Sequence, residues 1–414
     1  MNKKLVFIEP PHFLIPIFEK FSKEYNDELF LISNHLKNYS GKNYFNCDVR
    51  ENIDEARSYI RNTVINPDAI VTSTEMFLTQ TAELNNEFNL RGNSIETILN
   101  CRDKAMMKII WNEKNIPTPQ SNFFRSKSEL LGKADSLNYP VIIKPSLGYA
   151  SCGVRKVNDK EELLKQMNKI LLFNSTVIAR EKLNDIGFLV EQYIDGDEYS
   201  IDTIWLDGKP LCDGIMSKGN AKGPYFPDLL YFVDPNIESE DMQTIVNTSH
   251  NAVLAMGMNI GASHTELRIM DGNPYIIETT CRPGAGGMFF YLFEKSMGLE
   301  FYRIYYLTYL YQDANVLLDL INKPVKYSDK YYFLYNIPYP IKGIIKEING
   351  VDELKKQKDV LQAMCFKDKG SVIYESDMNA EYLCWILGEA DISIGKNDIH
   401  NYVKKFDNAL EVIV

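Results

Sequence analysis

Residues 264–287 read HTELRIMDGNPYIIETTCRPGAGG, two runs that alternate apolar and polar residues and are separated by Asp-Gly-Asn-Pro. The alternation predicts two antiparallel strands that each turn one face toward a core. Each run carries one glutamate, Glu266 in the first and Glu278 in the second. A three-residue loop at 271–273 would place these glutamates directly opposite each other, whereas a two-residue loop would shift the register by one and separate them.

Carboxylates that face each other across a strand pair repel, so the three-residue register requires a neutralising charge. A divalent cation would supply it, and oxygen ligands at this spacing suit Mg²⁺, which completes its shell with water and phosphate oxygens. The same register pairs Leu267 with Ile277 as a core contact on the other face, and Arg282 could project toward the carboxylates if the strand continues. The alternative is a solvated sheet face on which Arg268 pairs with the glutamates, and for an isolated pair that alternative is favoured.

The composition indicates a globular chain of two or three domains, because 414 residues exceed what one compact core usually holds. A net charge of −11 argues against a nucleic-acid or anionic-membrane surface. The seven cysteines are dispersed without a Cys-x-x-Cys pair, which predicts reduced thiols in the cytoplasm instead of a disulfide frame. We expect no signal peptide and no membrane-spanning stretch, and the five histidines lack the spacing of a zinc site.

Strand and helix patterns change along the chain. Residues 1–95 alternate β-α-β, which predicts a parallel sheet with ligands at the carboxyl ends of its strands. A helix-rich connector follows and is stopped by Pro117 and Pro119. From residue 120 the strands are separated by turn signals, and the tail is a short mixed segment. We therefore expect α/β architecture in the first part of the chain and α+β architecture in the remainder.

A serine- and glycine-rich loop follows the apolar strand PVIIK. Lys144 ends that strand, and the residues after it include Ser146, Gly148, Ser151 and Gly153. Such a loop can fold over phosphate groups and donate backbone N–H groups, while the lysine supplies a point charge. It is not a Walker loop, which would carry Gly-Lys-Ser/Thr and lead into a helix. By itself, the loop could equally be an ordinary surface turn.

The strand FLVEQ is followed by a second ligand-binding pattern. Backbone groups at Gln192 and Ile194 could meet an adenine edge just after Glu191 ends the apolar run. Glu198 lies seven residues after Glu191, and its carboxylate could accept two hydrogen bonds from ribose hydroxyls. An acidic surface loop is the alternative, because acidic side chains are mostly exposed.

Taken together, four segments resemble the ATP-grasp superfamily in their order and spacing: RDKAMMKIIWNEKNIPTP, YPVIIKPSLGYASCGV, VEQYIDGDEYSID and residues 264–287. The resemblance covers about residues 95–290, and the flanking segments are similar to the superfamily's N-terminal and C-terminal domains. It implies an ATP-grasp fold with a parallel-sheet N-terminal domain, a two-lobed antiparallel central domain and a small C-terminal α+β domain. The expected boundaries are 1–95 (N-terminal domain), 96–119 (helical connector), 120–190 (small lobe), 191–315 (large lobe) and 316–414 (C-terminal domain).

The resemblance also implies roles for the matching residues. Glu266 and Glu278 would bind Mg²⁺, with Mn²⁺ as an alternative, while Arg282 and Lys144 would act on the transferred phosphoryl group. Many members carry asparagine two residues after the second metal-binding glutamate; this chain has Thr280 there, so Thr280 is a further candidate ligand and the number of metal ions is open. The residues expected to hold ATP are Lys104, Lys144, Ser146, Gly148, Ser151, Gly153, Glu191, Gln192, Tyr193, Ile194, Glu198 and, more loosely, Lys218.

Within the superfamily, PDAIVTSTE and FNLRGNSIETILNCRDKAMM resemble the L-amino-acid ligases. This resemblance implies an enzyme that uses ATP to join a carboxylate, an L-amino acid, to the amine of a second amino acid through an acyl phosphate. Glu75 would bind a substrate ammonium, and Arg282, Gly286 and Gly287 would complete the substrate site. The loops GYASCG and 216–231 are candidate lids.

Other functions and partners stay open at this point. The ligase could use a carrier-protein-bound or non-amino-acid substrate, or the chain could bind ATP without catalysis, for which Thr280 is the only indication. Asp213, Asp228 and Asp377 could recognise a basic substrate, although most acidic side chains are simply solvated. We expect small-molecule amino acids as partners, no nucleic acid and no membrane, and a homodimer is one open form of assembly.

Overall fold

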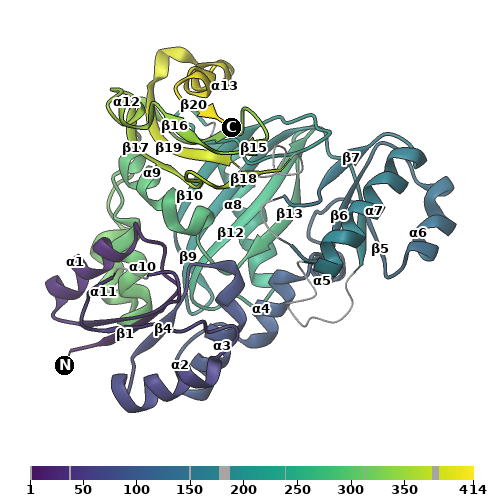
Figure 1. The fold of residues 1–414 in the computed structure, drawn as a ribbon. Helices are drawn as coiled ribbons and strands as arrows, with labels where there is room; N and C mark the ends of the chain where they lie inside the picture. The colour runs from purple at the N-terminus through teal and green to yellow at the C-terminus, as the bar shows by residue number, and fades with distance from the viewer. Residues whose placement is uncertain are drawn as a thin grey trace.

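The computed structural model describes residues 2–36, 39–148, 151–176, 187–237, 239–311, 313–374 and 382–414. Within them the chain forms a parallel N-terminal sheet, a small antiparallel sheet and a large eight-stranded sheet, with two short strand pairs near the C-terminus (Figure 1). This mixed architecture confirms the predicted fold class. No helix in the described ranges combines the length and apolar character needed to cross a bilayer.

The N-terminal sheet has four parallel strands in the order β3-β2-β1-β4. Its elements are β1 (Lys4–Ile8), α1 (Ile15–Tyr25), β2 (Glu28–Ile32), β3 (Tyr44–Phe45), α2 (Ile53–Tyr59), β4 (Ala69–Val71) and α3 (Leu78–Glu87). Val6 lies between Phe30 and Ile70, and all three are buried in one hydrophobic cluster with Ala56 of α2 and Leu84 of α3. Burial on both faces explains the continuous apolar strands that the sequence shows.

Two helices lead from this sheet into the small antiparallel sheet, whose order is β5-β8-β6-β7. The elements are α4 (Ile95–Arg102), α5 (Lys104–Glu113), β5 (Ser121–Phe124), α6 (Lys127–Lys133), β6 (Val141–Pro145), β7 (Arg155–Val157), α7 (Lys160–Thr176) and β8 (Phe188–Gln192). The Asp103 carboxylate caps α5 by accepting hydrogen bonds from the N–H groups of Ala105 and Met106. This cap fixes the start of α5 and thereby places Lys104, its first residue.

The large sheet has the order β13-β12-β9-β10-β11-β14-β19-β17. The elements are β9 (Asp197–Leu206), β10 (Lys209–Gly219), β11 (Leu230–Val233), α8 (Ser239–Ala255), β12 (Gly261–Met270), β13 (Asn273–Thr280), α9 (Met288–Met297), α10 (Phe301–Leu310), β14 (Lys330–Pro338), β17 (Val360–Cys365) and β19 (Tyr382–Asp391). On one face Ile245 of α8 clusters with Trp205, and on the other Phe293 of α9 clusters with Met216. The second cluster also includes Phe18 of α1, so the N-terminal and large sheets share one core.

The C-terminal part of the chain extends the large sheet, because β14 lies beside β11 and is followed by β19 and β17 (Figure 1). Its other elements are α11 (Ala314–Ile321), β15 (Gly343–Ile344), β16 (Glu347–Asn349), α12 (Val351–Lys355), β18 (Val372–Ile373), α13 (Ile399–Val403) and β20 (Glu411–Ile413). The boundaries expected at residues 95, 119, 190 and 315 stay a prediction.

The turn between β12 and β13 has two residues, so the three-residue loop expected from the sequence is wrong. Met270 pairs with Asn273, which leaves Asp271 and Gly272 in the turn. Both have positive φ, 52° and 74°, as a type I′ hairpin turn requires. An Asp-Gly pair between alternating strands is a strong local signal for that turn.

A bulge in β13 nevertheless brings the two glutamates together. Leu267 pairs with Ile276, not with Ile277 as expected, so a regular ladder would leave Glu266 without Glu278 opposite it. The register shifts at this point, and Ile277 is the additional residue. Glu266 therefore pairs with Glu278, as the sequence analysis expected, although by a different route.

Cys365 and Cys384 form a disulfide, so the expectation that every cysteine is a reduced thiol is wrong for this pair. They are 19 residues apart in the sequence, and they meet because β17 and β19 place them directly opposite each other with 3.9 Å between their Cα atoms. Spacing along the chain gives no sign of such cross-strand pairs. The remaining cysteines, all within the described residues, form none: Cys47, Cys101, Cys152, Cys212 and Cys281.

Glu294 of α9 provides a pH-dependent element of stability away from the cavities described below. Burial raises its pKa to about 7, with a smaller contribution from Glu300, although its carboxylate accepts a hydrogen bond from the Tyr302 N–H at 3.0 Å. The folded protein therefore holds this proton more tightly than the unfolded chain, and stability falls as pH rises from about 4.5 to about 7. Glu294→Gln should raise the free energy of unfolding by about 1–3 kcal/mol at pH 8 and leave it nearly unchanged at pH 4.5. Urea unfolding at the two pH values measures this difference, and an equal effect at both would contradict it.

Candidate active site

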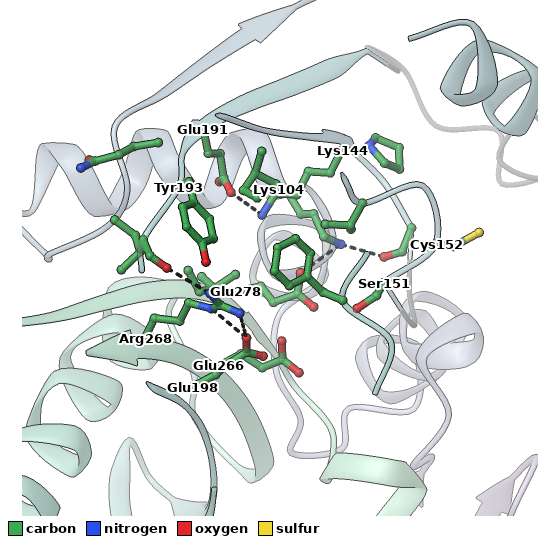
Figure 2. A pocket seen from close by; sticks show the side chains of 18 residues that line it. Lys104, Lys144, Ser151, Cys152, Glu191, Tyr193, Glu198, Glu266, Arg268 and Glu278 are labelled. Carbon is green, nitrogen blue, oxygen red and sulfur yellow. Dashed lines mark hydrogen bonds and ion pairs between the residues drawn. The ribbon is translucent and has the colours of Figure 1, made fainter. Parts of the chain in front are cut away.

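Two adjoining cavities lie between the small sheet and the large sheet. Figure 2 shows the side chains that line the first. The first, of about 80 Å³, is lined by β6, β8 and the segment after β8. The second, of about 390 Å³, extends from the N-terminal sheet to β14 and the start of β19. The residues that line both cavities are Lys104, Gly148, Ser151, Glu266 and Glu278.

Most of the residues expected at the site reach one of these cavities. In addition to the shared residues, the first is lined by Lys144, Glu191, Gln192, Tyr193, Ile194 and Glu198, and the second by Glu75, Thr280, Arg282 and Gly286. Four expected residues do not line them: Ser146, Gly153, Lys218 and Gly287. Lys218 lies behind Glu198 and Glu266 and contacts both carboxylates. The other three residues make hydrogen bonds to neighbouring segments. Thus the Ser146 Oγ accepts a hydrogen bond from the Gly187 N–H, the Gly153 carbonyl accepts one from Gln166, and the Gly287 carbonyl accepts one from the Tyr302 hydroxyl.

A buried group of two lysines and one glutamate forms the back of the first cavity. The Glu191 carboxylate lies 2.7 Å from the Lys144 Nζ and 3.2 Å from the Lys108 Nζ, and each side chain is only 3% exposed. Burial raises the pKa of Glu191, but the two ammonium groups outweigh it and lower the pKa below its usual value. Burial also lowers the pKa of Lys108 to about 8, against the attraction of Glu191. The four-residue spacing predicts Lys104 and Lys108 on one face of a helix, but it assigned Lys108 no role at the site.

Lys108 also supports the bulge in β13. Its Nζ donates to the carbonyl of Ile276 at 3.0 Å and to that of Ile277 at 2.9 Å, while the Thr118 hydroxyl lies 2.8 Å away. These carbonyls belong to the irregular part of the strand, where a regular ladder cannot satisfy them. The same ammonium therefore contacts both Glu191 and the backbone that sets the register of Glu278.

Lysines neutralise the paired carboxylates of Glu266 and Glu278, which project into the space shared by the cavities (Figure 2). The Lys104 Nζ is 3.3 Å from Glu278, and the Lys218 Nζ is 3.4 Å from Glu266. Burial raises the pKa of Glu266, but Lys218 and His264 outweigh it and hold the pKa far below its usual range. An ionised carboxylate is the form that binds a divalent cation.

The carboxylates of Glu266 and Glu278 are of the ligand type that Mg²⁺ and Mn²⁺ prefer. Two hard oxygen ligands open onto one cavity, and Mg²⁺ usually takes one or two carboxylates and completes its shell with water and phosphate oxygens. Within the described residues, no group of three or more histidine, cysteine, aspartate or glutamate side chains forms a closed metal cage. The arrangement therefore suits a metal that arrives with a phosphate ligand.

A buried histidine–aspartate pair stands behind Glu266. The His264 Nδ1 lies 2.7 Å from the Asp202 carboxylate, whose other oxygen accepts the N–H of Gly284 at 2.6 Å. Burial lowers the pKa of His264, but Asp202 and Glu266 outweigh it and raise the pKa to about 9. This pair adds positive charge beside Glu266 and ties β12 to the start of the glycine cluster, and the sequence analysis did not include it.

Glu75 connects the N-terminal sheet with the end of β13. Its carboxylate accepts hydrogen bonds from the Thr280 hydroxyl at 2.7 Å and the Arg282 Nε at 2.8 Å, and Arg102 lies 3.8 Å away. Burial raises the pKa of Glu75, but Arg282, Thr280 and Arg102 outweigh it and lower the pKa. The Thr280 hydroxyl thus serves Glu75 here, and its role as a metal ligand stays a prediction.

Arg268 organises the other side of the first cavity. Its guanidinium donates to the Glu198 carboxylate at 2.8 Å, to the Ile194 carbonyl at 3.0 Å and to the Ala221 carbonyl at 3.1 Å. The side chain is buried and ties Glu198 to the segment after β8 (Figure 2). The solvated sheet face considered for Arg268 is therefore wrong, and its two-residue spacing from Glu266 was the available signal.

The second expected lid, 216–231, contacts β7, the strand that follows the glycine-rich loop. The Lys156 N–H in β7 donates to the Pro224 carbonyl at 2.8 Å, and the Arg155 guanidinium lies 5.3 Å from the ring centre of Tyr225. In the glycine-rich loop, residues 149 and 150 lie outside the described residues. Of the acidic residues considered for a basic substrate, Asp228 lines the second cavity, Asp377 lies outside the described residues, and Asp213 instead pairs with His250 at 2.7 Å.

Comparison with known proteins gives concordant matches. Residues 137–289 match the model of the ATP-grasp domain family. The alanine–anticapsin ligase of Bacillus subtilis (strain 168) is 24% identical over 231 residues, 52% of this chain and 48% of that protein. The L-arginine-specific L-amino acid ligase of Bacillus subtilis is 24% identical over 331 residues, 77% of this chain and 75% of that protein. The crystal structure of an L-amino acid ligase from Bacillus licheniformis superposes with a TM-score of 0.81 at 26% identity, covering 100% of this chain and 98% of that one.

The match to the first of these relatives spans about half of its length. The family model includes Lys144, the segment after β8 and the whole β12–β13 hairpin, which line most of the first cavity, whereas Lys104 precedes the matched residues. The structural match extends the likeness over the N-terminal and C-terminal parts as well. The chain therefore contains an ATP-grasp domain at residues 137–289 and has the ATP-grasp fold along its length.

Proposed function

We propose that this protein is an ATP-dependent ligase that joins the carboxylate of one L-amino acid to the amine of a second amino acid and releases ADP and phosphate. The observation that carries this proposal is the meeting of a narrow lysine-bordered cavity and a wider cavity at the Glu266–Glu278 pair. The relatives named as an alanine ligase and an L-amino acid ligase support the same class of reaction.

ATP would bind at the first cavity and in the space that it shares with the second, and the first cavity, of about 80 Å³, would have to widen to admit it. Backbone groups at Gln192 and Ile194 would meet its adenine, Glu198 its ribose, and Lys104 and Lys144 its phosphates. Glu266 and Glu278 would hold Mg²⁺, or Mn²⁺ in its place, which when bound offsets phosphate charge. The loop 148–153 and the segment 216–231 would cover the nucleotide and exclude water.

The amino acids would occupy the second cavity. There the γ-phosphoryl group would pass to a carboxylate oxygen of the first amino acid, giving an acyl phosphate and ADP. The ammonium group of the second amino acid would lose a proton to water and attack the acyl carbon as the free amine. The bond to the phosphate oxygen would break and release phosphate, and the new amide nitrogen would lose its second excess proton to water. Arg282, which Glu75 holds at 2.8 Å, would contact the acyl phosphate and the oxyanion formed during the attack. No covalent enzyme nucleophile is needed.

The test is a screen of the twenty common amino acids in pairs with ATP and MgCl₂. We expect phosphate and ADP to appear in equal amounts only with productive pairs, and mass spectrometry to find the sum of the two amino acids less one water. EDTA in excess of the metal should abolish the reaction, because the phosphates would then lack a counter-ion at the carboxylates. Phosphate release independent of amino acids, or none with any pair, would contradict the proposal.

A further inference from the structure

The second cavity has a polar end built by the C-terminal strands, opposite to Glu75 and Arg282. Asp228, just before β11, lines this end together with Asn336 of β14 and Tyr382 of β19. The contacts of Lys104 and Lys144 do not explain why β14 and β19 reach the cavity. Those of Glu266 and Glu278 do not explain it either. The question is what an acidic group at this position recognises.

Both backbone groups of Asp228 are held by side chains from those strands. Its N–H donates to the Tyr382 hydroxyl oxygen at 2.7 Å, and its carbonyl accepts a hydrogen bond from the Asn336 Nδ2 at 2.6 Å. The backbone of Asn336 is fixed as well, because its N–H donates to the Leu229 carbonyl at 2.8 Å. With both backbone groups fixed, the Asp228 side chain leaves the main chain in one direction, and it lines the cavity while being only 19% exposed.

The charge around Asp228 is not balanced. The Lys218 Nζ is shared by Asp228 at 2.9 Å, Glu266 at 3.4 Å and Glu198 at 2.5 Å. Arg268 offsets Glu198, and the His264 ring beside Glu266 is itself paired with Asp202 at 2.7 Å. Asp228 and Glu266 therefore share the single ammonium group of Lys218, and one negative charge remains. The second cavity is therefore negative at the Asp228 end, whereas the guanidinium group of Arg282 lies with Glu75 elsewhere on its wall. An anionic acyl phosphate and a cationic amine would be attracted to different parts of such a cavity.

We propose that Asp228 binds the ammonium group of the amine-donating substrate, and that Asn336 and Tyr382 are positioning residues that aim its carboxylate. This inference rests on the proposed ligase function and assigns one of its two substrates to one end of the second cavity. The shared lysine keeps Asp228 close to Glu266, so an amine held there lies beside the position proposed for the phosphoryl group. The C-terminal strands thus take part in substrate selection.

Hydroxylamine separates the two half-reactions. It is small and largely uncharged at neutral pH, so it can trap an acyl phosphate as a hydroxamate without an ammonium-binding group. For Asp228→Asn we expect kcat/KM for the amine-donating amino acid to fall about 10- to 100-fold, mainly through KM, because a carboxylate–ammonium contact is lost. Hydroxamate formation from the first amino acid should stay within about twofold of the wild type. Tyr382→Phe should change the amine KM in the same direction by a smaller factor.

Asp234→Asn is the matched control, since Asp234 follows the other end of β11 and does not line the cavity. It should leave both reactions unchanged. An equal loss of hydroxamate and peptide in Asp228→Asn would overturn the inference, and so would an unchanged amine KM. A loss confined to lysine and arginine as amine donors would also overturn it, because Asp228 would then read a side-chain cation. If the wild type forms no hydroxamate from any amino acid, the proposed function fails and the inference fails with it.

Discussion

Replacing Glu278 with glutamine is expected to lower amino-acid-dependent ADP formation by about 1,000-fold, which corresponds to roughly 4 kcal/mol of transition-state stabilisation. Glutamine keeps the size of the side chain and one oxygen. It removes one of the two negative charges that Glu266 and Glu278 bring together across β12 and β13. The remaining carboxylate, Glu266, cannot by itself supply the two hard ligands proposed for Mg²⁺. The measurement is the steady-state rate of ADP release at saturating ATP, MgCl₂ and amino acids.

Two companion variants make this result interpretable. Glu266→Gln should cause a loss of similar size, whereas Glu96→Gln, an exposed glutamate on α4, should leave the rate unchanged. Calorimetric titration with ADP provides a second readout: MgCl₂ should tighten binding to the wild type and have little effect on Glu278→Gln. A Glu278→Gln enzyme within threefold of the wild-type rate would contradict the proposed metal-binding role of the pair.

The sequence predicted that Glu266 and Glu278 pair, but it did not predict the bulge that brings them together. Alternation in residues 264–280 is sufficient to predict two facing strands, and the Asp-Gly turn is a local signal that could have been read correctly. The bulge at Ile277 is different, because it depends on a buried ammonium from α5. Lys108 is far from Ile277 in the sequence, and no local pattern indicates that its Nζ lies 2.9 Å from that carbonyl. The expected pairing is therefore confirmed, while the expected loop is wrong.

Contacts between distant segments explain the other features that the sequence did not reveal. The motifs that resemble the ATP-grasp superfamily end near residue 290, and so the cavity wall formed by Asn336 and Tyr382 has no counterpart among them. The disulfide between Cys365 and Cys384 depends on the register of β17 and β19, which alternation alone does not fix. By contrast, a strand-ending lysine such as Lys144 can be recognised from its local sequence.

Lys108→Met is expected to lower the free energy of unfolding by about 3–5 kcal/mol, because it breaks a buried ion pair and leaves a carboxylate with one partner fewer. The Lys108 ammonium lies 3.2 Å from Glu191 and donates to the carbonyls of Ile276 and Ile277. Its loss also removes this donor from the Ile277 carbonyl, whereas the Ile276 carbonyl keeps the Thr118 hydroxyl at 2.9 Å. Methionine fills a similar volume, which separates the effect of charge from that of a cavity. Urea denaturation measures the change, with Lys114→Met, at an exposed position after α5, as the control.

A double-mutant cycle with Glu191→Gln identifies which of these contacts dominates. If the ion pair with Glu191 carries most of the loss, the two substitutions should be strongly non-additive, with an interaction energy of about 1–3 kcal/mol. If the bulge carbonyls dominate, the losses should add, because Glu191 does not contact that backbone. In both cases Lys108→Met should also lower ADP formation, since the bulge that sets the register of Glu278 loses its support. A stability change below about 1 kcal/mol, with unchanged ADP formation, would show that the hairpin keeps its register without Lys108.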